Sequence, residues 1–125
     1  ADWATGMPLP ALFERLMCVD DALMMIGEAR AAGAVWLNEV ADSLAGAGKD
    51  DLAALARKAA ERFEGERAVA DEIEALPEWR EAGEKRALAL ADTSVRRKLV
   101  GRIDRAAGLD RAAAEAIREL LGSWR

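Results

Sequence analysis

The amino-acid composition predicts an all-α protein. Alanine occurs 29 times in 125 residues, whereas Val, Ile and Thr together occur 12 times, and Tyr and Gln are absent. Ala, Leu, Arg and Glu favour helices, and β-branched residues favour strands. A chain of this length usually forms one domain. We therefore expect a single all-α domain over 1–125, with an irregular lead-in over 1–9 and a bundle of five to six helices.

The longest helical pattern runs over about 50–76. Apolar residues recur there in steps of three, four and seven, among them Leu52, Leu55, Ala59 and Phe63, while the opposite face is charged. This spacing marks one face of an α-helix. It predicts a long central helix, on whose apolar stripe the other helices pack.

Two helices are expected before the central one. The first covers about 10–32 and opens with Pro10, a residue that suits the first position of a helix. Gly33 is expected to stop or kink it, and a second helix follows over about 34–45. A helix start at Asp20-Asp21 would instead split the first segment in two. Six apolar residues are expected on the inward side of the first helix: Leu12, Phe13, Leu16, Met17, Leu23 and Ile26.

Three helices are expected after the central one. Pro77 ends the central helix, because the residue before a proline avoids the helical conformation, and a helix over about 78–91 follows. Two further helices, over about 94–107 and 110–122, are separated by Gly108, since glycine is common just beyond a helix C-terminus.

Charge is distributed unevenly along the chain. The formal net charge is −5, but residues 1–93 carry −9 and residues 94–125 carry +4. An acidic molecule is a poor nonspecific ligand for nucleic acid. The basic C-terminal part could bind nucleic acid, or it could complement the acidic part when the chain folds.

The chain contains no histidine and a single cysteine, Cys18. These absences exclude histidine-based nucleophile systems, cysteine zinc sites and iron–sulfur clusters. We therefore expect a protein without enzymatic activity, metal or cofactor. One cysteine allows no internal disulfide and fits a reducing compartment, here a cytoplasm, and no apolar run is long enough to span a membrane. The excess of Arg over Lys is typical of a GC-rich bacterial genome.

A protein–protein interaction function is the first hypothesis. Four tryptophans occur in a chain without tyrosine, and tryptophan is enriched at interface hot spots. Trp3 and Trp124 lie near the ends of the chain, where burial in a core is least assured. We expect them to contact a protein partner, as in an adaptor or inhibitor, or a second copy in a homo-oligomer.

A DNA-binding regulator is the second hypothesis. Residues 94–121 loosely resemble a helix-turn-helix, with the turn at 107–109. Asp104 argues against it, because a small residue is needed at that position to pack the two helices together. Asp110 and Glu115 of the second helix also argue against it, because acidic side chains repel phosphate. The basic residues available for phosphates are Arg96, Arg97, Lys98, Arg102 and Arg105, and Arg111 is placed to read a base.

Small-molecule binding is the third hypothesis. Methionine adapts to irregular shapes, and apolar pockets between helices are common ligand sites. An apolar pocket between helices would be lined by Met17, Met24, Met25 and Trp36.

Overall fold

The computed structural model describes residues 8–124, and these residues form helices joined by short connections, without a strand. The predicted all-α class is therefore confirmed. Trp3 and most of the expected lead-in lie outside the described residues. None of the described helices combines the length and hydrophobicity that a membrane span needs. The described helices are α1 (Leu9–Gly46), α2 (Asp50–Glu74), α3 (Pro77–Arg80), α4 (Gly83–Ala91) and α5 (Thr93–Ser123).

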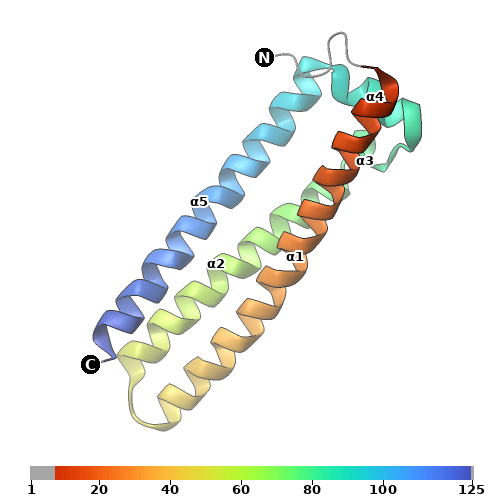
Figure 1. Cartoon of the computed structure of the whole chain (residues 1–125). Helices are drawn as coiled ribbons and strands as arrows, with labels where there is room; N and C mark the ends of the chain where they lie inside the picture. Colours follow the sequence, from red (N-terminus) through yellow and green to blue (C-terminus); the bar gives the residue numbers. More distant parts are fainter. Residues whose placement is uncertain (1–7, 125) are drawn as a thin grey trace.

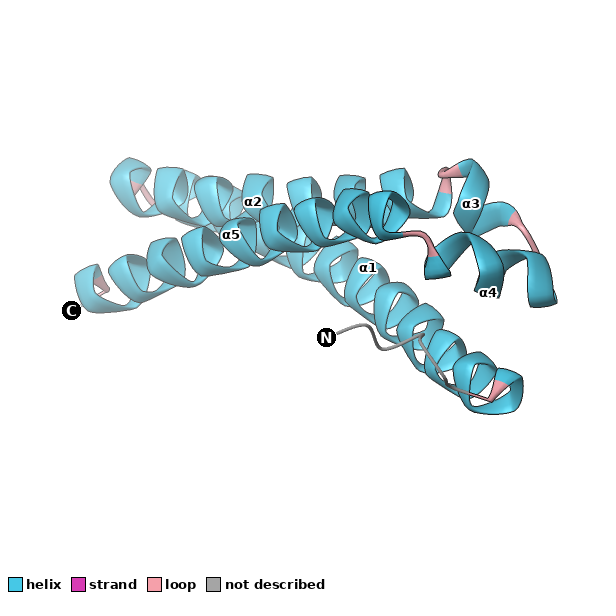
Figure 2. Cartoon of the chain, turned by 90° about the horizontal axis from the view of Figure 1, so that it is seen from above, coloured by secondary structure: helices cyan, strands magenta, loops and turns pink. Residues whose placement is uncertain are grey.

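Three long helices run side by side along the molecule, with α2 in the middle (Figure 1). The chain descends through α1, returns through α2 and descends again through α5, so α1 and α5 point in the same direction. Seen from above, α1 crosses the other two helices at an angle (Figure 2). The short helices α3 and α4 cover one end, where α4 packs against both α1 and α5. The expected central helix is thus central in position, but α1 and α5 are longer.

Helix α1 is continuous through Gly33, so the predicted break there is wrong. A Cβ atom at Gly33 would lie 3.0 Å from Cδ2 of Phe63 on α2. The glycine therefore permits close packing of α1 on α2 rather than a turn. Asp20 does not start a new helix either; its carboxylate forms an ion pair with Arg86 of α4, whose guanidinium carbon lies 4.1 Å from the centroid of the Trp79 ring.

The helix predicted over 78–91 is divided into α3 and α4. Between them, Glu81 and Ala82 adopt extended backbone, and Gly83 has φ of 58°. That value lies in the left-handed region, which glycine enters without the steric cost of a Cβ atom. Gly83 therefore allows the chain to change direction between the two short helices.

The two helices predicted over 94–107 and 110–122 are one continuous helix, α5. Its N-terminus is capped by Asp92, whose Oδ1 accepts hydrogen bonds from the backbone N–H and the hydroxyl of Ser94, each at 2.7 Å. The Ser94 hydroxyl and N–H hold the pKa of Asp92 below its usual value. Gly108 lies within the helix, so the turn on which the helix-turn-helix depended is absent from this segment.

The core consists of three clusters along α2. Two of them, the middle cluster and the lower cluster near the α1–α2 loop, are built on buried alanines of α2. The small side chains of these alanines let α1 and α5 approach α2 closely. At the end covered by α3 and α4, larger residues are buried: Leu12, Leu16, Val69, Ile73, Trp79, Leu90 and Val95. The middle and lower clusters include Leu37, Leu44 and Leu120 with the alanines Ala53, Ala56, Ala59 and Ala60.

Candidate functional site

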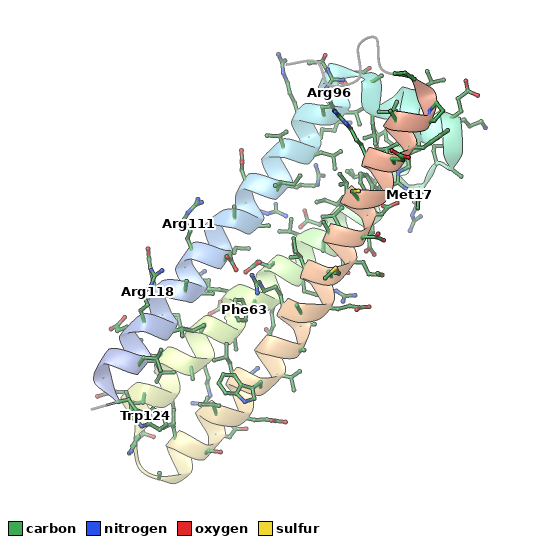
Figure 3. All side chains as sticks on the ribbon, viewed as in Figure 1. Met17, Phe63, Arg96, Arg111, Arg118 and Trp124 are labelled. Carbon is green, nitrogen blue, oxygen red and sulfur yellow. The ribbon has the colours of Figure 1, made fainter. Side chains whose placement is uncertain are left out.

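The residues expected to line an apolar pocket lie on the surface of α1. Met17, Met24, Met25 and Trp36 retain 65%, 51%, 65% and 61% of their accessible surface. All four come from this one helix, where Figure 3 labels Met17. Met17 and Ile26 were also expected on the inward side of the helix, and this expectation is wrong, because both are exposed.

An apolar row runs along the exposed side of α1. Its members follow in alternating steps of four and three residues, so they lie on one side of the helix. All are exposed, and none is charged. We call this set the outer row: Cys18, Ala22, Met25, Ala29, Ala32 and Trp36.

Acidic residues border the outer row. Glu14, Asp21 and Glu28 are exposed and seven residues apart, so they lie on one side of α1. We call them the acidic flank. Within residues 8–124, none of the three forms an ion pair. The outer row and its flank together resemble one half of a helix–helix interface.

A groove of about 500 Å³ lies at the end of the outer row, between Trp36 and Trp124. Trp124 follows α5 and is 52% exposed. Figure 3 labels it at the end of the molecule where the α1–α2 loop lies. Nζ of Lys49, in that loop, lies 5.3 Å from the centroid of the Trp124 ring. Two tryptophans that are far apart in the sequence therefore share one open apolar surface.

Four of the basic residues predicted to contact nucleic acid form contacts within the chain. The Arg96 guanidinium donates to the Leu90 carbonyl oxygen at 3.1 Å, which ties α5 to the end of α4. Lys98 Nζ lies 3.3 Å from Glu78 Oε1, and Arg102 Nε lies 3.8 Å from Glu72 Oε2. Arg105 also forms an ion pair with Glu72.

The other two predicted basic residues, Arg97 and Arg111, are exposed. Neither forms an ion pair with the described part of the chain, and the same holds for Arg118. Figure 3 shows Arg111 and Arg118 projecting from α5 away from α2. Since α5 continues through 107–109, these arginines lie along one straight helix and not on a recognition helix after a turn.

A charged cluster around the buried Glu66, which was not predicted from the sequence, joins the three long helices. Arg30 Nε of α1 donates a hydrogen bond to Glu66 Oε2 of α2 at 3.2 Å, and Arg30 Nη2 forms an ion pair with Asp110 Oδ1 of α5 at 2.7 Å. The guanidinium also lies 4.9 Å from the centroid of the Phe63 ring. The cluster fixes the relative positions of α1, α2 and α5.

Glu66 is the most restricted member of this cluster, with an exposed fraction of 3%. Burial raises its pKa, the nearby Asp110 carboxylate raises it further, and the hydrogen bond from Arg30 opposes both effects. Its Oε1 has no hydrogen-bond partner in residues 8–124. The sequence contained one sign of this cluster. Arg30 interrupts a row of apolar residues with seven-residue spacing, which consists of Leu23, Leu37 and Leu44.

Neither a metal-binding cluster nor a similar protein assigns a function to these surfaces. Across residues 8–124, no three His, Cys, Asp or Glu side chains are grouped closely enough to hold a metal ion. The chain matches no protein-family model, no curated protein and no solved structure in the comparisons made.

Proposed function

We propose that this protein is a protein–protein interaction module, and that its docking surface is the outer row of α1. One observation carries the proposal: an unbroken apolar row, ending in Met25, Ala29, Ala32 and Trp36, is exposed along a helix whose other side forms the core. Contiguous exposed apolar surface usually marks an interaction site. Trp36 and Met25 are the residue types that contribute most at such sites.

The occupant that fits this surface is an amphipathic helix with basic flanks. The small side chains of Ala22, Ala29 and Ala32, beside the larger Met25 and Trp36, offer holes for the side chains of a second helix. The acidic flank favours arginine or lysine beside the apolar seam of that helix. The same flank disfavours an anionic lipid surface, which attracts basic and not acidic segments.

Binding can be measured with synthetic peptides that carry a fluorophore at one end. The probe is a helical peptide of about 20 residues, long enough to be helical when bound, with leucine on one side and arginine on both flanks. We expect the fluorescence anisotropy of this peptide to rise when the protein is added at nanomolar concentration. A peptide with glutamate in place of arginine should bind at least about tenfold more weakly.

Two variants identify the surface. Met25→Asp and Trp36→Asp place a charge in the apolar seam and should each weaken peptide binding by about tenfold or more. The matched control is Leu88→Asp, the same kind of change at an exposed residue of α4, which should bind the peptide like the wild type. If neither peptide binds, or if both outer-row variants bind like the control, the proposed function is wrong.

A further inference from the structure

We propose that the basic amphipathic helix which occupies the outer row is α5 of a second copy of this chain. This inference rests on the proposed function and names the partner for the same surface. It follows from a second exposed face, on α5, whose apolar residues and charges complement those of α1.

The exposed face of α5 carries apolar residues with seven-residue spacing. Val100 and Leu121 are both more than half exposed, and Ala107 and Ala114 lie between them at the same spacing. Ile103 extends this surface and is also exposed. We call Val100, Ala107, Ala114 and Leu121 the α5 row; it spans about 32 Å, against about 27 Å for the outer row, at 1.5 Å per residue.

Arg111 and Arg118 border the C-terminal half of the α5 row, and the exposed Asp104 lies one seven-residue step before them on the same side. Arg111 and Arg118 are seven residues apart, as are Asp21 and Glu28. In two packed helices, positions seven residues apart recur on one side about every 10 Å. One register can therefore pair both arginines with both acids.

The two faces cannot meet within one molecule. Helices α1 and α5 lie on either side of α2, and Arg111 and Arg118 project away from α2 (Figures 1 and 3). Pairing α1 with α1 of another copy would place acids against acids, and pairing α5 with α5 would place arginines against arginines. Pairing α1 with α5 of a second copy instead joins Asp21 and Glu28 to Arg111 and Arg118.

Charge reversal with complementation tests the assignment. The first variant carries Asp21→Lys and Glu28→Lys, and the second carries Arg111→Glu and Arg118→Glu. By sedimentation equilibrium, each variant alone should dimerise at least about tenfold more weakly than the wild type. An equimolar mixture should recover the wild-type association, because lysines on one copy then face glutamates on the other.

Two controls match the charge changes at exposed positions elsewhere. Glu74→Lys with Glu81→Lys matches the first variant, and Arg80→Glu with Lys85→Glu matches the second. Both controls should dimerise like the wild type, and circular dichroism should show equal helix content in all variants.

Three outcomes overturn the inference. These are a wild-type chain that stays monomeric, a second variant that dimerises like its control, and a mixture that does not recover association. If peptide binding to the outer row is still observed, the proposed function stands and only the identity of the partner is wrong. Loss of peptide binding contradicts the proposed function itself.

Discussion

Glu66 is the one charged side chain that is fully buried within residues 8–124. It belongs to a cluster that takes one residue from each long helix, with Arg30 between Glu66 and Asp110. An ionised carboxylate as deeply buried as that of Glu66 is costly without a cation beside it, whereas Arg30 is one-third exposed and also pairs with Asp110. The cluster therefore favours one alignment of the helices over sliding alternatives along the alanine-rich surface of α2.

The raised pKa of Glu66 predicts a pH dependence of stability. A carboxyl whose folded-state pKa is raised binds its proton more tightly in the folded state, so its stabilising contribution is present below the ordinary value of 4.5 and is lost as pH rises through the folded-state pKa. Glu66→Gln, which imitates the protonated form, should unfold at a higher temperature than the wild type at neutral pH. It should also lose less stability on going from pH 5 to pH 8.

Thermal unfolding between these pH values checks this expectation. Glu61→Gln is the matched control, because Glu61 is an exposed carboxylate of the same helix. Its unfolding temperature should depend on pH like that of the wild type. An equal pH dependence for Glu66→Gln and the wild type would contradict the assignment of the raised pKa to Glu66.

At the scale of elements, sequence reasoning predicted the helical segments well and their ends poorly. The end of α2 before Pro77 follows local chemistry and was predicted. Its start at Asp50 was also predicted, although the N-cap residue is Lys49 and no side chain caps the helix there. The ends expected at Gly33 and Gly108 do not occur. A glycine inside a helix costs only about 1 kcal/mol relative to alanine, so tertiary packing readily exceeds this local penalty.

The inward side of α1 could not be predicted from periodicity. Apolar residues surround much of this helix, so more than one stripe satisfies the helical period. Leu12, Leu16, Met17 and Ile26 were all predicted to face inward. The structure buries Leu12 and Leu16 but leaves Met17 and Ile26 exposed. Only the position of α2 decides which stripe is covered. The same ambiguity hid the outer row, which became visible once the covered side was known.

Two glycines within helices should respond oppositely to alanine. At Gly101 of α5 nothing lies within 4 Å of an added Cβ, so Gly101→Ala should raise the free energy of unfolding by about 1 kcal/mol through helix propensity. At Gly33 the added Cβ would meet the Phe63 ring at 3.0 Å. Because Arg30 lies over that ring, Gly33→Ala should instead lower the free energy by about 1 kcal/mol.

Urea denaturation of both variants measures this difference. Adding Phe63→Leu to Gly33→Ala should recover part of the loss, since a smaller side chain leaves room for the methyl group. A stabilising effect of Gly33→Ala that equals the effect at Gly101 would show that the glycine does not serve close packing of α1 on α2.

At the scale of the whole molecule, the sequence showed the charge asymmetry but not its use. Part of the basic C-terminal segment neutralises the acidic part within the chain, as in the ion pairs of Glu72 with Arg105 and of Glu78 with Lys98. The remaining charges lie on outward faces of α1 and α5. Linear charge counts cannot separate these two groups, because residues two positions apart along a helix face different sides of it.

The central claim is that the outer row of α1 is covered by another copy of the chain. Cys18 belongs to that row and is exposed in a single copy, so its reactivity reports the coverage directly. The most direct test is the rate at which a small alkylating reagent modifies Cys18, measured over rising protein concentration in the presence of a phosphine reductant. The control is Ala68→Cys in a Cys18→Ala background, which places the thiol at an exposed position of α2.

We predict that the alkylation rate of Cys18 falls as protein concentration rises and that the rate at position 68 stays constant. The fall should disappear in the variant with Arg111→Glu and Arg118→Glu. A Cys18 rate that is independent of concentration, up to concentrations at which a weak dimer forms, would contradict the claim.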